Sequence, residues 1–218
     1  MTYLSKDDLA GDLDLDESLD RLPDEETLEE TIANIERRNI AVTVCETADE
    51  ALEYLRDRIP QNASVANGRS TTLSELGFID HLQREDGYTY LNDRIRGIDD
   101  DERREEARRE AVTADVFFDS PNAIAATGEI TGVNGKGTSL GAWPYPAKRL
   151  VLVSGTNKVV TTLEDALARL RNVAYPLEDA RVRTVEGHES VIGKVMIYEH
   201  EKQDGRTELV LVKDNYGF

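Results

Sequence analysis

The sequence predicts an α/β fold in which a mostly parallel sheet is flanked by helices. Short apolar runs such as residues 116–118 and 151–153 are β-branched or aromatic and are bounded by Gly, Asn, Ser and Pro, a pattern typical of buried strands. These runs alternate along the chain with segments of helical periodicity. Polar residues with small side chains follow the runs directly, where ligands bind in open α/β sheets.

The N-terminal residues 1–22 carry seven acidic residues and scattered leucines. Such a composition predicts an acidic leader that is loosely attached and has some helical tendency. The remaining residues, 23–218, are enough for a single domain with a sizeable core. We therefore expect one domain preceded by a short leader.

Two helices and two strands are expected to alternate in the first half of the domain. A helix begins after Asp24, because the acidic residues that follow favour a helix N-terminus. A second helix begins after Thr47, which is expected to act as an N-cap with Glu50 three residues further on. Strands are expected at residues 40–45 and 63–66, because both runs are short and apolar.

In the second half, residues 98–112 predict a solvated, charged helix with opposite charges at helical spacing. After the apolar runs of the central segment, Thr162 opens a further helix, which Pro176 is expected to end. Two β-rich segments, residues 191–198 and 208–212, flank a turn-like sequence. We expect them to form a C-terminal β hairpin added to the sheet.

The charge of the chain argues against a nucleic-acid-binding role. The sequence holds 44 acidic and 26 basic residues, for a formal net charge of -18, and Arg greatly outnumbers Lys. Binding to a phosphate backbone needs a basic face, which this composition does not supply. An acidic, lysine-poor surface instead suggests adaptation to a high-salt cytoplasm, where self-repulsion is screened. A solvated acidic surface with no such meaning is the alternative.

Cys45 is the one cysteine of the sequence and lies in an apolar run, so we expect it to be a buried structural residue. A single thiol builds neither an iron–sulfur cluster nor a cysteine-based zinc site, and His81, His188 and His200 are far apart in the sequence. We therefore expect no metal and no cofactor on this chain. No signal peptide or membrane span is visible, which predicts a cytoplasmic protein without membrane insertion.

The first candidate site is the loop formed by Asn67, Gly68, Arg69, Ser70 and Thr71, which joins a short strand to a helix. Its backbone N–H groups and hydroxyls suit a phosphate or carboxylate, and Arg69 could add a bidentate contact to the same anion. Alternatively, Ser70 or Thr71 only caps the helix and Gly68 makes the turn. The loop alone favours neither interpretation.

Two further loops carry candidate residues. In the second, Asn122 follows one strand, and Thr127, Gly128 and Glu129 open the next. Glu129 could serve as a base or nucleophile if it is half-buried at a strand end, although a surface glutamate is the commoner case. In the third, Lys158 could meet an anionic substrate or pair with Glu129, whereas spacing alone favours a solvated lysine.

Taken in order, the loops closely resemble the LUD (lactate-utilisation) domain family, of the LutC/YkgG type. The likeness rests on VANGRSTTLSELG, ADVFFDSPNAIAATGEI and RLVLVSGTNKVVTTLEDALARLRNVAYP, and it covers residues 40–176. It implies a fold similar to that of the ribose-phosphate isomerase and CoA-transferase group, in which a Gly/Ser/Thr loop before a helix binds an anionic part of the ligand. With this resemblance, the anion interpretation of the first loop becomes the stronger one.

The resemblance also implies a part in the oxidation of L-lactate to pyruvate, together with partner proteins that hold iron–sulfur clusters. Residues 180–199 lack the cysteine-rich stretch found in some family members, so the chain is not expected to carry electrons itself. The polar positions of the family fall on Gly68, Ser70, Asn122, Thr127, Gly128, Glu129, Asn157, Lys158 and Arg171.

One hypothesis and two alternatives follow for function. The chain is expected to be a non-redox subunit or ligand-binding component of lactate oxidation, and the expected ligand is a small carboxylate or phosphate. This ligand is expected to lie among Ser70, Asn122, Glu129 and Lys158. One alternative is an isomerase or CoA/acyl transferase that uses Glu129 as catalytic base or nucleophile. The other is a metabolite-sensing scaffold protein.

Overall fold

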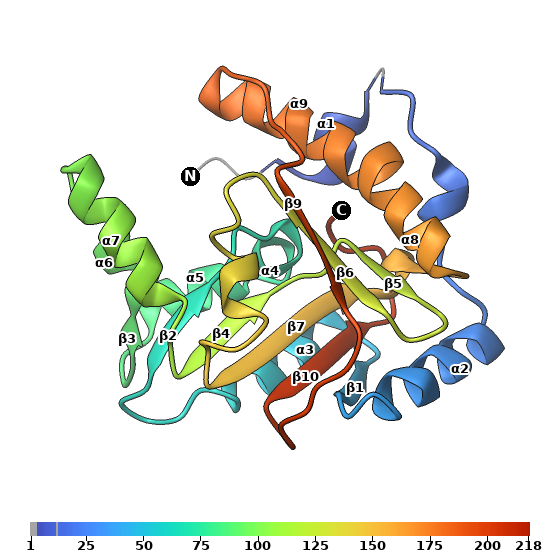
Figure 1. Ribbon diagram of the computed structural model, residues 1–218, viewed down its shortest axis with the longest axis horizontal. Helices are drawn as coiled ribbons and strands as arrows, with labels where there is room; N and C mark the ends of the chain where they lie inside the picture. The colour runs from blue at the N-terminus through green and yellow to red at the C-terminus, as the bar shows by residue number, and fades with distance from the viewer. Residues whose placement is uncertain (1–3, 12) are drawn as a thin grey trace.

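The strands form two sheets in the computed structural model, which describes residues 4–11 and 13–218 (Figure 1). The first sheet has six strands in the order β1-β10-β7-β4-β2-β3, and every neighbouring pair is parallel. The second sheet has four strands in the order β8-β5-β6-β9. The prediction of a mostly parallel sheet is therefore confirmed. The strands are β1 (Ala41–Cys45), β2 (Ser64–Asn67), β3 (Thr89–Tyr90), β4 (Val116–Asp119), β5 (Ala123–Ala125), β6 (Ile130–Asn134), β7 (Arg149–Gly155), β8 (Val159–Val160), β9 (Lys194–Tyr198) and β10 (Thr207–Val212).

The helices connect these strands, and the caps expected from the sequence are present. Asp24 accepts a hydrogen bond from the N–H of Thr27, and Thr47 accepts one from the N–H of Glu50. Within the described residues, no helix combines the length and the apolar composition that crossing a bilayer requires. The helices are α1 (Lys6–Ala10), α2 (Glu25–Glu36), α3 (Ala48–Arg56), α4 (Thr71–Glu75), α5 (Phe78–Arg84), α6 (Leu91–Arg96), α7 (Asp101–Ala111), α8 (Leu163–Arg169) and α9 (Tyr175–Glu186), with 3-10 turns η1 (Glu17–Leu19), η2 (Leu140–Ala142) and η3 (Thr156–Lys158) and a π-helical turn η4 (Leu170–Ala174).

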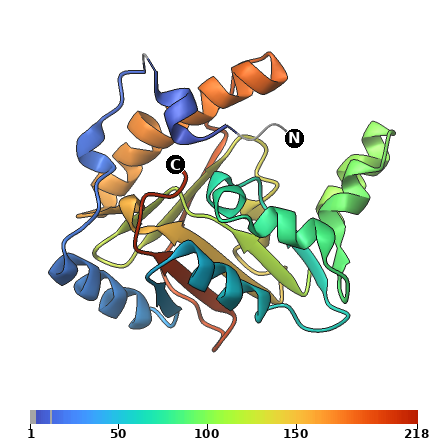
Figure 2. The ribbon, with the colours of Figure 1, turned by 180° about the vertical axis from the view of Figure 1, so that it is seen from behind.

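The six-stranded sheet is buried between two layers. Leu150 and Leu152 of β7 pack in one apolar core with residues of α2 and of the second sheet. Val151 and Val153 point to the other face and pack in a second core with residues of α3, α4 and α5, which lie across that face in Figure 2. Because both faces are covered, the central strands are continuous apolar runs in the sequence.

The predicted C-terminal hairpin is wrong, although both of its strands exist. β9 pairs antiparallel with β6 in the second sheet, whereas β10 lies parallel between β1 and β7 at the centre of the first. Every residue of β10 is buried, as a central strand requires. The segment between β9 and β10 therefore crosses from one sheet to the other instead of making a hairpin turn.

Pro176 does not end the helix that begins after Thr162. α8, the π-helical turn η4 and α9 follow one another without a break up to Glu186. The π-helical turn shifts the hydrogen-bond register just before Pro176, so the missing N–H of the proline falls in the first turn of α9. A proline fits this position because its fixed φ suits the first turn of an α-helix.

The N-terminal leader is packed against the domain rather than loosely attached. Its helical tendency is confirmed by α1 and by η1. Leu9 of α1 is buried with Val173, Leu177 and Phe218, and Leu19 packs against a separate small cluster beside α8. These contacts bring the leader to the end of the molecule where the candidate loops lie.

Candidate functional site

The carboxyl ends of four parallel strands meet at one edge of the first sheet. In the sheet register, Asn67 of β2 lies beside Phe118, Asp119 of β4 beside Leu152, and Gly155 of β7 beside Val212 of β10. The loops that follow β2, β4, β7 and β10 therefore come together, as expected for a ligand site in an open α/β sheet.

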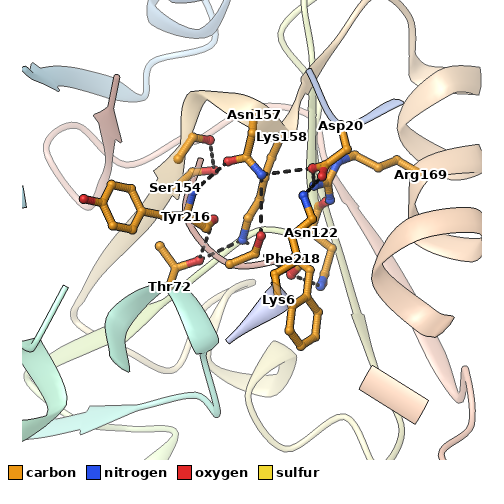
Figure 3. Close-up of polar contacts among 12 residues, drawn as sticks. Lys6, Asp20, Thr72, Asn122, Ser154, Asn157, Lys158, Arg169, Tyr216 and Phe218 are labelled. Carbon is orange, nitrogen blue, oxygen red and sulfur yellow. Dashed lines mark hydrogen bonds and ion pairs between the residues drawn. The ribbon is translucent and has the colours of Figure 1, made fainter. Parts of the chain in front are cut away.

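The side chain of Lys158 lies among these loops and contacts residues of several of them (Figure 3). Lys158 ends the 3-10 turn η3 after β7, and its side chain is almost completely buried. Its Nζ donates hydrogen bonds to Thr72 Oγ1 at 2.9 Å, to Ser120 Oγ at 2.9 Å and to the Pro121 carbonyl at 3.1 Å. Burial lowers the pKa of Lys158 well below its ordinary value, and repulsion from Arg169 adds to this effect. The sequence alone favoured a solvated lysine, and that interpretation is wrong.

The two hydroxyls on Lys158 were not among the candidates from the sequence. Thr72 lies in α4 and Ser120 follows β4, and the Ser120 hydroxyl also donates to Thr72 Oγ1 at 3.1 Å. The tail after β10 covers this group, with the carbonyl of Tyr216 accepting from Thr72 at 3.3 Å and that of Phe218 lying 3.5 Å from Lys158 Nζ. Only the parallel packing of β2, β4 and β7 brings these hydroxyls together, which no local pattern reveals.

A second cation, Arg169, lies next to Lys158. Its side chain is completely buried at the end of α8, and it donates to the carbonyl of Asn122 and to Asp20 Oδ1, the latter at 2.5 Å. Asn157 Nδ2 donates to the same Asp20 oxygen at 3.0 Å. Burial lowers the pKa of Arg169 to about 9, which still leaves the guanidinium charged at neutral pH.

Arg171, the arginine expected at the site, is exposed and donates to the carbonyl of Leu167 in its own helix. Arg169 therefore takes the inward position that the sequence analysis assigned to Arg171. A helical phase that places Ala166 and Leu170 on the buried face would also have placed Arg169 near it. Asp20 had no such signal, because its partner lies 149 positions away.

Asp119 is a buried carboxylate at the end of β4. It accepts hydrogen bonds from Trp143 Nε1 at 2.8 Å and from the N–H of Ser120 at 2.9 Å. Burial raises the pKa of Asp119 to about 6 in spite of these bonds. A Cβ at Gly68 would lie within 2.2 Å of its carboxylate, so the first candidate loop needs a glycine at this position for the close approach.

The other residues of the first loop are occupied by partners outside the Lys158 group. Ser70 caps α4 by accepting from the N–H of Leu73 at 3.1 Å, which is the capping role considered from the sequence. Asn67 accepts from the hydroxyl of Tyr90 at 2.6 Å. Arg69 forms an ion pair with Glu186, and Thr71 is the first residue of α4.

Glu129 belongs to a different part of the molecule. With Thr127 and Gly128 it lies in the turn between β5 and β6, whereas Lys158 contacts the segment that precedes β5. Glu129 pairs with Arg38 at 2.5 Å and accepts a hydrogen bond from Thr127. Burial opposes its ionisation, but Thr127 and Arg38 outweigh burial and hold the pKa of Glu129 below its ordinary value. Glu129 therefore does not pair with Lys158, and the structure separates it from the Lys158 loops.

The buried group around Lys158 brings together several hydrogen-bond donors of the kind that can bind an anion. It contains a lysine amino group, a guanidinium, an amide N–H₂ and two hydroxyls, all of which can donate hydrogen bonds to a carboxylate. Among residues 4–11 and 13–218, no group of three His, Cys, Asp or Glu side chains could hold a metal ion. Asn122 adjoins the group through its carbonyl, which accepts from Arg169, and its Oδ1 accepts from the N–H of Val133 at 2.9 Å.

Comparison with known proteins agrees with the fold and with the loop sequences. A family model described as the LUD domain matches residues 28–212. A crystal structure of a DUF162 family protein from Deinococcus radiodurans has a similar fold, with a TM-score of 0.50 and 11% sequence identity over 89% of this chain and 100% of that one. A search of curated proteins found no match.

Proposed function

Because this chain belongs to the LUD domain family, we propose that it is a non-redox, ligand-binding component of a system that oxidises L-lactate to pyruvate. The observation that carries the proposal is the convergence of the loops after β2, β4 and β7 on the buried Nζ of Lys158. Family membership supports a role related to lactate utilisation, and this geometry supports a binding site for one of its acids.

The ligand proposed for this site is a small carboxylate. L-lactate and pyruvate each have a carboxylate with an oxygen on the adjacent carbon. The guanidinium of Arg169 and the amino group of Lys158 can donate to the carboxylate, and the hydroxyls of Thr72 and Ser120 can donate to or accept from the neighbouring oxygen. Burial strengthens each of these interactions, because the local dielectric is low.

The oxidation itself is assigned to partner subunits with iron–sulfur clusters. Clusters are held by several cysteine thiolates, whereas this chain has Cys45 alone. Cys45 is buried in the core beside α3, and burial raises the pKa of its thiol. We therefore propose that the chain presents or receives the acid while a partner carries the electrons. Retention of a cluster-containing subunit in a pull-down at high salt would support this arrangement.

An enzyme that uses Glu129 has less support. Glu129 is paired with Arg38, and its pKa lies below the ordinary value, so it is a weak base. A covalent thioester at Glu129, found by mass spectrometry after incubation with an acyl-CoA, would favour this alternative. A scaffold role would be favoured by partner retention without any binding of small acids.

Calorimetric titration with sodium L-lactate and sodium pyruvate tests the proposal. We expect saturable binding to the wild-type protein and a loss of about tenfold or more in affinity for Lys158→Met, which removes the ammonium. Lys136→Met is the matched control, because Lys136 is an exposed lysine that pairs with Glu105. No saturable binding of either acid, or equal binding by both variants, would contradict the proposal.

A further inference from the structure

The carboxylate of Asp20 lies between Arg169 and Lys6. Its Oδ1 accepts from Arg169 Nη2 at 2.5 Å and from Asn157 Nδ2 at 3.0 Å, and its other oxygen pairs with Lys6 (Figure 3). The Asp20 side chain is 6% exposed. A carboxylate with both oxygens in use is therefore already present among the donors that suit a small acid.

Asp20 satisfies Arg169 incompletely. The Nε of Arg169 is buried, and no described residue accepts a hydrogen bond from it. Arginine binds a carboxylate best through two parallel N–H···O bonds, whereas Asp20 uses only Nη2 and gives its second oxygen to Lys6. A free carboxylate that reached Nε and Nη2 together would satisfy the guanidinium better than Asp20 does.

The donors and the internal carboxylate come from different parts of the chain. Asn157, Lys158 and Arg169 lie within residues 28–212, the range that matches the LUD domain. Asp20 and Lys6 belong to the leader, outside that range. At this site the leader supplies the carboxylate of Asp20 and the ammonium of Lys6, so its departure would leave Arg169 without a paired carboxylate. An external anion is the natural replacement, because a buried unpaired charge is costly.

The leader is held by few elements. Its described residues form the five-residue helix α1, the three-residue turn η1 and irregular segments. Among its described residues, Leu9 is the buried apolar side chain. Other apolar side chains of the leader pack against the domain while only partly buried: Leu4, Ala10, Leu13, Leu15 and Leu19. Short terminal segments with small buried surfaces open at low free-energy cost compared with the strands and helices of a core.

We propose that Asp20 is an internal substitute for the carboxylate of the ligand, and that a small carboxylate displaces it from Arg169 and Asn157. This proposal rests on the proposed function, because it concerns the same acid-binding site. Asp20 is tethered, so it competes at a high effective concentration. The ligand binds only the fraction of molecules in which Asp20 has left, and its apparent affinity is reduced by that fraction.

Titration of the Asp20→Ala variant with sodium pyruvate tests this proposal. We expect the variant to bind pyruvate about tenfold more tightly than the wild-type protein, because the competing carboxylate is absent. Asp14→Ala is the matched control, since Asp14 is an exposed acid of the same leader, and its affinity should equal that of the wild type. Adding Arg169→Met to Asp20→Ala should abolish the gain.

A second measurement covers the case in which Asp20→Ala folds poorly. Pyruvate added to the wild-type protein should increase amide hydrogen exchange in the peptide containing Leu9 and in that containing Leu19, and leave exchange in β7 unchanged. Equal pyruvate affinities of the wild-type and Asp20→Ala proteins, or unchanged exchange in the leader at saturation, would overturn the role of Asp20 and leave the proposed function intact. If neither the wild-type protein nor Asp20→Ala binds pyruvate, both the role of Asp20 and the proposed function are overturned.

Discussion

Two arginines are buried among residues 4–11 and 13–218, and their surroundings differ. Arg206 pairs with Glu201 at 2.8 Å, and it also donates to three backbone carbonyls from Nε and Nη2. Its partners all lie between residues 142 and 207, inside the range that matches the LUD domain. Arg169 pairs with Asp20 from the leader, and its Nε has no acceptor among the described residues.

We interpret the Arg206–Glu201 pair as structural and the Arg169–Asp20 pair as one in which another carboxylate can replace Asp20. The Arg206 group joins β10 to the crossing segment after β9, and the hydroxyls of Tyr198 and Thr207 complete it. Removal of either partner from a buried pair that is satisfied in this way strongly destabilises the fold, because the other charge is left buried and unpaired. The Arg169 group instead depends on a short segment that can leave, so another carboxylate can take the place of Asp20.

Removal of each acid is the strongest test of this difference. Glu201→Ala should lower the free energy of unfolding by about 3–5 kcal/mol, because it leaves the Arg206 charge buried and unpaired. Asp20→Ala should cost only about 1–2 kcal/mol, since the leader can move and water or an anion can reach Arg169. Urea denaturation measures both values. Equal losses of unfolding free energy in Glu201→Ala and Asp20→Ala would contradict the difference between the two ion pairs.

The pH dependence of stability should also differ between the two regions. The pKa of Asp119, near Lys158, is raised to about 6 by burial, so its stabilising contribution is full below about pH 4 and is lost as the pH rises through 6. Between pH 4 and pH 7 the wild-type protein should therefore lose about 2–3 kcal/mol relative to Asp119→Asn. Glu201 behaves in the opposite way. Hydrogen bonds from Tyr198 and Arg206 outweigh its burial and hold its pKa at about 2.

The contribution of Glu201 is therefore present above about pH 4.5 and is lost as the pH falls through 2. Thermal melts of the wild type, Asp119→Asn and Glu201→Gln across this range compare the two carboxylates. A stability difference between the wild type and Asp119→Asn that stays constant from pH 4 to pH 7 would show that burial does not raise the pKa of Asp119.

The smallest effect is expected at the arginine that the sequence favoured. Arg171→Ala should change the free energy of unfolding by no more than about 0.5 kcal/mol and leave pyruvate binding unchanged, because the side chain is exposed and contacts only its own helix. Arg169→Met should abolish pyruvate binding. A loss of pyruvate binding in Arg171→Ala would show that Arg171, the arginine inferred from the family resemblance, belongs to the binding site.

Local patterns predicted much of the fold. The strands β1 and β2 and the caps Asp24 and Thr47 depend on residues close together in the sequence, and they are confirmed. Pairing is not local, so β9 and β10 were identified as strands but assigned to each other instead of to two different sheets. The π-helical turn before Pro176 was likewise invisible, since it breaks the regular period on which helix prediction depends.

The site was predicted only in part for the same reason. Lys158 and Asn157 follow a strand, and their loop was identified from its polar residues. Thr72 enters the site through the alignment of β2 with β7 across β4, and Asp20 enters through the packing of the leader. Neither contact leaves a signal at short range in the sequence.

The central claim is that a small carboxylate and Asp20 compete for one place. A crystal structure of the Asp20→Ala variant with sodium pyruvate tests it most directly. The account predicts a carboxylate bound to Nε and Nη2 of Arg169 and to Asn157 Nδ2, close to Lys158. Pyruvate bound at Glu129, or a variant crystallised at saturating pyruvate with Arg169 free of any carboxylate, would contradict it.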